Sequence, residues 1–119
     1  MNRVLVVDDE QYIGLLIRHI LQSHGYEVVV TTCVADALEK LQSEHFNLVF
    51  TDLNMPGENG FSLLETIQQQ PQHTSVVVIT AQGEEEITGQ ALALGARDLL
   101  HKPFSRQSLL KMARKFLAA

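Results

Sequence analysis

The sequence predicts an α/β fold, a doubly wound parallel sheet built from five consecutive βα units in a chain of 119 residues. Short runs of β-branched and aliphatic residues alternate with longer segments in which apolar residues recur at helical spacing. The strand-like runs are apolar at nearly every position, which is typical of strands covered by helices on both faces. No linker, repeat or low-complexity segment interrupts this order. We therefore expect one domain spanning residues 1–119.

The first two units follow this pattern closely. Residues 3–7 are expected to form a strand, and Gly25 is suited to end the helix that follows it. Residues 27–31 are expected to form the second strand, after which Thr31 or Thr32 is available as a helix cap. The helical stripes are Ile13, Leu16, Ile17, Ile20 and Leu21 in the first helix, and Val34, Leu38 and Leu41 in the second.

The last three units repeat the alternation. Their expected strands are residues 47–51, 75–79 and 98–101. Pro71 should stop the third helix, Gly95 should end the fourth, and Ser105 can cap the fifth. The helical stripes are Phe61, Leu64 and Ile67, then Ile87, Ala91 and Leu94, and finally Leu109, Met112, Ala113 and Phe116.

Composition narrows the function classes. The formal net charge of −5 argues against nucleic-acid binding by this segment alone. No stretch approaches the 18 or so apolar residues of a membrane span, so no membrane partner is expected. The single cysteine, Cys33, cannot form an intramolecular disulfide, and the N-terminal residues do not resemble a signal peptide. We expect a cytoplasmic protein.

Polar side chains follow four of the predicted strands. Asp8 and Asp9 follow the first, Asp52 the third, Thr80 the fourth and Lys102 the fifth. If the strands are parallel, these side chains converge at one edge of the sheet, where such folds bind ligands. Clustered carboxylates repel unless a cation joins them, and oxygen ligands suit Mg²⁺.

Asp52 is the expected nucleophile of this site. A carboxylate can form an aspartyl phosphate, and Asp52 stands alone at its strand end. Phosphoryl transfer mostly requires positioning and charge neutralisation, which Mg²⁺, Lys102 and the Thr80 hydroxyl can supply. These residues therefore predict a magnesium-dependent phosphoryl-accepting site.

Over essentially its whole length the chain resembles the receiver domain of two-component response regulators. The matching motifs are Val-Val-Asp-Asp-Glu at 6–10, Thr-Asp-Leu-Asn-Met-Pro-Gly at 51–57, Gly60, Ile-Thr-Ala at 79–81, Gly-Ala at 95–96 and Lys-Pro-Phe at 102–104. Their order and spacing make the resemblance highly specific. It implies a flavodoxin-like sheet with strand order 2-1-3-4-5, which spacing alone does not fix.

The resemblance also implies roles at the site. Asp52 would accept the phosphoryl group from a sensor histidine kinase or a histidine phosphotransfer protein. Asp9 would ligate Mg²⁺ directly and Asp8 partly through water, while Asp52 and the backbone carbonyl of Asn54 would complete the protein ligands. Such a domain catalyses only its own phosphorylation and slow dephosphorylation, so we do not expect an enzyme acting on a separate substrate. Homodimerisation on phosphorylation stays open.

Further expectations concern the end of the sheet. Thr80 would move to bond a phosphoryl oxygen, Lys102 would pair with the phosphoryl group, and the Lys102–Pro103 peptide bond should be cis. The family usually has tyrosine or phenylalanine three residues before the lysine, whereas this chain has Leu99. This departure puts the usual coupling of threonine and aromatic ring in doubt, but not the phosphorylation chemistry.

Three other functions share parts of this residue pattern. A degenerate receiver that serves only as a protein-interaction module is disfavoured by the intact acid, hydroxyl and lysine set. A magnesium phosphatase of the haloacid-dehalogenase type would need a second aspartate two residues after the nucleophile, where this chain has Asn54. A flavin- or nucleotide-binding domain would need a glycine-rich phosphate loop after the first strand, and none is present.

Overall fold

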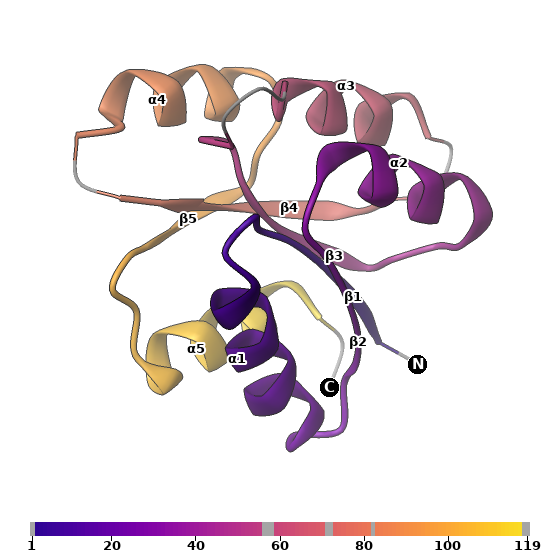
Figure 1. Cartoon of the computed structure of the whole chain (residues 1–119), viewed down its shortest axis with the longest axis vertical. Helices are drawn as coiled ribbons and strands as arrows, with labels where there is room; N and C mark the ends of the chain where they lie inside the picture. The colour runs from indigo at the N-terminus through magenta and orange to yellow at the C-terminus, as the bar shows by residue number, and fades with distance from the viewer. Residues whose placement is uncertain (1, 56–58, 71–72, 82, 118–119) are drawn as a thin grey trace.

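The computed structural model describes residues 2–55, 59–70, 73–81 and 83–117 and has a five-stranded parallel sheet between two layers of helices (Figure 1). The strand order is β2-β1-β3-β4-β5, and every neighbouring pair is parallel. The predicted fold class is therefore confirmed, including the strand order taken from the resemblance. The elements are β1 (Arg3–Val7), α1 (Gln11–Gln22), β2 (Glu27–Thr31), α2 (Val34–Ser43), β3 (Leu48–Asp52), α3 (Phe61–Gln69), β4 (Ser75–Thr80), α4 (Glu85–Ala93), β5 (Asp98–His101) and α5 (Arg106–Phe116).

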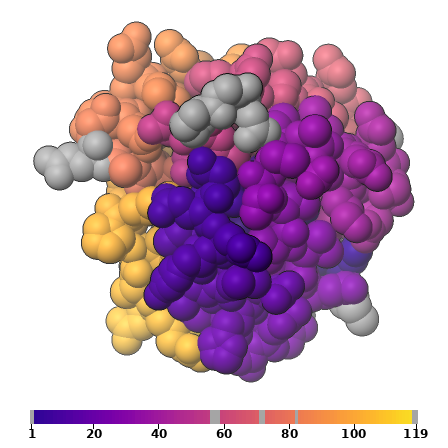
Figure 2. Space-filling view, viewed as in Figure 1, coloured from indigo at the N-terminus to yellow at the C-terminus, as the bar shows by residue number. Residues whose placement is uncertain are grey.

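Alternate residues of the strands pack into two separate hydrophobic cores, one on each face of the sheet. Leu5 and Val7 of β1 pack with α2, α3 and α4, whereas Val4 and Val6 pack with α1 and α5. The same division is visible in Figure 1, where α2, α3 and α4 cover one face of the sheet and α1 and α5 the other. In the space-filling view the surfaces of α1 and α5 lie side by side (Figure 2). Burial on both faces explains the near-continuous apolar strands.

The boundaries differ from the predicted ones where polar residues take part in strand pairing. β3 ends at Asp52 and β4 at Thr80, one residue later than predicted in each case. The prediction that Thr31 or Thr32 caps α2 is wrong, because the N-cap residue is Cys33, whose side chain makes no capping hydrogen bond. Thr31 instead ends β2, and its hydroxyl donates to the Val6 carbonyl oxygen at 3.0 Å.

The other predicted helix signals can be compared with the structure. Gly25 and Gly95 follow α1 and α4 with φ of +89° and +111°, a left-handed conformation that glycine adopts readily. The Ser105 hydroxyl accepts the Ser108 N–H at 3.0 Å and caps α5, as predicted. α3 ends at Gln69, and the proposed stop at Pro71 lies outside the described residues. Within the described part of the chain, no helix has the length and apolar character needed to span a membrane.

Candidate functional site

The carboxyl ends of the strands bring the predicted site residues to one edge of the sheet. Asp8 directly follows β1, and Asp52 is the last residue of the neighbouring strand β3. The Lys102 N–H donates to the Thr80 carbonyl oxygen at 2.7 Å, which continues the β4–β5 pairing beyond the strand ends. The parallel register therefore gathers two acids, a hydroxyl and a lysine that lie far apart in the sequence.

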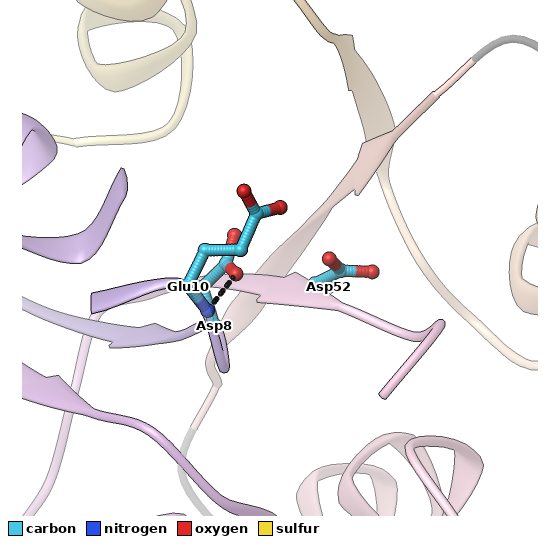
Figure 3. Close-up of side chains that lie close together, drawn as sticks. All are labelled: Asp8, Glu10 and Asp52. Atoms are coloured by element: carbon cyan, nitrogen blue, oxygen red, sulfur yellow. Dashed lines mark hydrogen bonds between the residues drawn. The ribbon is translucent and has the colours of Figure 1, made fainter. Parts of the chain in front are cut away.

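Three carboxylates meet at this edge, and one of them was not predicted. Asp8, Glu10 and Asp52 each offer an oxygen within 4.8 Å of the other two (Figure 3). Glu10 turns back over Asp8 because its N–H donates to Asp8 Oδ1 at 2.9 Å, an Asx-type turn. Asp9, which the sequence suggested as the direct metal ligand, is exposed and outside this group. The sequence signal that could have identified Glu10 is its position two residues after Asp8 at a strand end, where an Asx turn can form.

Lys102 places its ammonium group among these acids. The Nζ distances to the carboxylate oxygens are 2.9 Å for Glu10 Oε1, 3.2 Å for Asp52 Oδ2 and 3.4 Å for Asp8 Oδ2. The Lys102 side chain is only 18% exposed, and its contacts with the buried Asp8 and Asp52 are shielded from solvent, whereas the Glu10 side chain is 61% exposed. The Lys102–Pro103 peptide bond is cis, as predicted. One cation is thus shared by three carboxylates.

Burial dominates the electrostatics of the two aspartates. It raises the pKa of Asp8 to about 6, although the Glu10 N–H and the Lys102 charge act in the opposite direction. Burial also raises the pKa of Asp52, again opposed by the Asn54 N–H and by Lys102. For Lys102, burial would lower the pKa, but the bond to Glu10 and the two aspartate charges outweigh burial and raise it. The ammonium therefore stays charged at neutral pH.

The acid cluster fits a divalent cation. Asp8 is fully buried, and its Oδ2 has no hydrogen-bond partner among the described residues, since the 3.4 Å approach of Lys102 lacks hydrogen-bond geometry. A buried carboxylate oxygen without a partner is costly unless a cation is bound there. Asp8 and Asp52 could therefore hold Mg²⁺ through oxygen ligands. That Asp9 and the backbone carbonyl of Asn54 also ligate Mg²⁺ stays a prediction.

The backbone after β3 also fixes Asp52. The Asn54 N–H donates to Asp52 Oδ1 at 2.8 Å, while Oδ2 of the same carboxylate faces Lys102. The side chain of Asn54 is exposed. Asp52 itself is only 5% exposed, so its two oxygens are held in a defined orientation at the edge of the sheet. This arrangement suits a nucleophile that must be positioned before it reacts.

Thr80 borders a cleft between the site and α4. The cleft has a volume of about 290 Å³ and is lined by Thr80, Ala81, Glu85, Thr88, His101 and Lys102. The Thr80 hydroxyl is buried, and its contact with the Ala81 carbonyl oxygen is long, at 3.4 Å. Leu99, at the position where an aromatic residue was expected, is half-buried and packs against the core beneath α4. A weakly held hydroxyl next to open space is able to change partners.

Comparisons with known proteins agree with this geometry. Residues 4–114 match the family model described as the response regulator receiver domain. The chain is 40% identical over 112 residues to the chemotaxis protein CheY of Treponema pallidum, covering 92% of this chain and 78% of that one. It is 32% identical to CheY of Bacillus subtilis over 98% of both chains. The structure of CheY4 of Vibrio cholerae superposes with a TM-score of 0.89 at 34% identity, over 98% of this chain and 99% of that chain.

Some relatives are considerably longer. The transcriptional regulatory protein CpxR of Escherichia coli is 35% identical over 98% of this chain, which spans only 50% of CpxR. The family match extends from β1 to α5 and includes every strand end that contributes to the acid and lysine cluster. This chain therefore belongs to the response regulator receiver domain family.

Proposed function

We propose that this chain is a phosphorylation-dependent signalling switch that accepts a phosphoryl group on Asp52 with the help of Mg²⁺. The observation that carries this proposal is the environment of Asp52. Its carboxylate is buried, is oriented by the Asn54 N–H and by Lys102, and lies beside Asp8, whose Oδ2 has no hydrogen-bond partner among the described residues. A nucleophilic carboxylate next to a cation site is what an aspartyl phosphate requires.

The transfer step can be written from these residues. An electron pair on an Asp52 carboxylate oxygen forms the new O–P bond as the P–N bond to a donor phosphohistidine breaks. The electron pair of that bond stays on the imidazole nitrogen, which then takes a proton from water. Lys102 offsets the charge of the phosphoryl oxygens, and the Thr80 hydroxyl donates to one of them. Bound Mg²⁺, held by Asp8 and Asp52, would neutralise further phosphoryl charge.

The proposed phosphodonor is a sensor histidine kinase or a histidine phosphotransfer protein. Support comes from an apolar cleft of about 330 Å³ beside the site, lined by Tyr12, Ile13, Leu16, Lys102, Pro103 and Phe104. Tyr12 is 66% exposed and lies in this apolar lining, so its ring is accessible to a docked partner. Because Lys102 borders both this cleft and the acid cluster, a protein docked on the cleft would reach Asp52.

The same proposal covers turnover and location. The chain would act on no separate substrate, and its only chemistry would be its own phosphorylation followed by slow hydrolysis. Its place would be the cytoplasm, where the catalytic part of a sensor kinase could reach it. Relatives named for chemotaxis and for transcriptional regulation are consistent with a switch whose output depends on its partner.

The test is direct phosphorylation. The wild type, Asp52→Asn and the control Asp36→Asn, an acid-to-amide change in the first turn of α2, are incubated with acetyl phosphate and Mg²⁺, and the modified residue is mapped. We expect labelling of wild type and control and none of Asp52→Asn. Label on another aspartate, or undiminished label in Asp52→Asn, would refute the assignment. A wild type that takes no label from acetyl phosphate or from a kinase would favour an interaction module without phosphorylation.

A further inference from the structure

Glu84 joins the end of β4 to the start of α4. Its Oε1 accepts the Ala81 N–H at 2.7 Å, and its main-chain carbonyl accepts the Thr88 N–H at 2.9 Å within the first turn of the helix. Gly83, with φ of +90°, lets the backbone turn so that the Glu84 side chain reaches back. One half-buried residue therefore contacts both the loop that follows Thr80 and the helix beyond it.

The N–H that Glu84 occupies lies beside the site. Ala81 directly follows Thr80, and Ile79 of the same strand is paired with Asp52 in the sheet. Ala81 lies just beyond the end of β4 and lines the same cleft as Thr80 and Lys102, and its N–H donates to a side chain of its own loop. Burial is the main cause of the raised pKa of Asp52, the Asn54 N–H and Lys102 oppose it, and the negative charge of Glu84 makes the smallest contribution, in the raising direction. The carboxylate is thus close enough to influence Asp52 electrostatically.

We propose that Glu84 is a positioning residue that competes with a phosphoryl group on Asp52 for the Ala81 N–H. This inference rests on the proposed function. In the unmodified protein Glu84 holds this donor, as the structure shows. A phosphoryl group adds close to two negative charges and three strong acceptor oxygens. It repels the Glu84 carboxylate and bonds to the N–H that the carboxylate releases, next to the Thr80 hydroxyl.

Displacement of Glu84 has a consequence for α4. The first turn of this helix also carries Glu85 and Glu86, so a released Glu84 adds a third free carboxylate at the helix start. The contact between the Glu84 side chain and Ala81, which ties the loop to the helix, is lost at the same time. Phosphorylation of Asp52 would in this way loosen the connection between β4 and α4, which is a local step toward the output surface.

A purely structural role for Glu84 makes the opposite prediction. If Glu84 only stabilised the loop, its removal would disorder the Ala81 N–H and weaken binding of any phosphoryl mimic. If Glu84 competes, its removal frees the donor and removes a repelling charge, so the mimic binds more tightly. The direction of the change in affinity therefore separates the two roles.

The experiment titrates beryllofluoride at saturating Mg²⁺ into the wild type, Glu84→Ala, Glu84→Gln and the control Glu86→Gln, which removes the same charge from an exposed position on the helix. We expect Glu84→Ala to bind about three- to tenfold more tightly, as for one hydrogen bond and one partly screened charge, with Glu84→Gln changed in the same direction. Glu86→Gln should stay within about twofold of wild type, since an exposed charge is largely screened.

Amide NMR gives a second readout that does not depend on binding strength. In the free protein, only the Glu84 variants should shift the Ala81 amide resonance, and beryllofluoride should bring the Ala81 resonances of wild type and Glu84→Ala together. Equal or weaker binding by both Glu84 variants, or equal tightening by Glu86→Gln, would overturn the competition. Failure of the wild type itself to bind beryllofluoride would instead refute the proposed function.

Discussion

Replacement of Asp8 by asparagine should stabilise the folded protein while impairing its metal site. Asp8 is fully buried and shares a single ammonium group with two other carboxylates. An asparagine has nearly the same shape, and its carbonyl oxygen can still accept the Glu10 N–H that Asp8 Oδ1 accepts at 2.9 Å. The substitution therefore removes a buried charge with little change in packing.

The magnitude follows from the pKa of Asp8. Burial raises it from the ordinary value of 3.8 to about 6, so the ionised group destabilises the fold at neutral pH by about 3 kcal/mol. Because the folded-state pKa is the higher one, this cost is present in full above pH 6 and disappears as the pH falls below 3.8. The new amide N–H₂ group faces Lys102 and offsets part of the gain. We expect Asp8→Asn to raise the free energy of unfolding by about 2 kcal/mol at pH 7.5.

The assay is urea unfolding with a metal chelator, at pH 7.5 and at pH 5. At pH 5 the advantage of Asp8→Asn should fall to roughly a third, because wild-type Asp8 is then mostly protonated when folded while the offset from the amide group remains. Added Mg²⁺ at pH 7.5 should stabilise the wild type more than the variant. The difference between their free energies of unfolding should therefore become smaller. An Asp8→Asn protein no more stable than wild type at pH 7.5, or a gap independent of pH, would refute the reasoning.

The remaining predictions concern ligands, a turn and the switch. Asp9→Asn should weaken Mg²⁺ binding in calorimetric titrations more than Glu10→Gln does. If Glu10→Gln weakens binding more, the metal ligands are instead the grouped carboxylates Asp8, Glu10 and Asp52. Gly60→Ala should lower the free energy of unfolding by about 1–3 kcal/mol, because its Cβ would lie 2.9–3.3 Å from Leu53 atoms, two of them main-chain; unchanged denaturant midpoints would contradict this. Beryllofluoride should shift amide resonances mainly within residues 80–104, and shifts confined to α1 and α2 would place the signalling face elsewhere.

The sequence was sufficient to predict the sheet because its strands are buried on both faces. A strand such as Ser75–Thr80 is buried along its whole length, so its boundaries appear as changes in hydrophobicity. The predicted ends of β3 and β4 lie one residue too early, because Asp52 and Thr80 are polar yet still pair within the sheet. The order of the strands came only from the resemblance, because spacing does not distinguish one parallel arrangement from another.

The sequence predicts which residues lie together at the site where the backbone fixes their position. It predicts less where a long, flexible side chain can reach several partners. Asp52 Oδ2 and Lys102 Nζ lie 3.2 Å apart because the sheet register brings their strand ends together. Glu10 and Glu84 reach their contacts through flexible side chains and turns, which periodicity does not reveal. Asp9 adjoins Asp8 in the sequence but is exposed, and its part in metal binding stays a prediction.

Glu10 and Glu84 play similar parts in the unmodified site, because each accepts a hydrogen bond from a donor near Asp52. Glu10 holds the ammonium of Lys102 at 2.9 Å, and Glu84 holds the N–H of Ala81 at 2.7 Å. Both donors are groups that a phosphoryl group on Asp52 would attract, and both acceptors are side chains at the surface of loops. If Asp52 is phosphorylated as proposed, each donor changes partner and each glutamate is released, one after β1 and one before α4. A single covalent change in a buried site would then alter the charged surface on two sides of it, even though Leu99 lacks the aromatic ring that usually accompanies the switch.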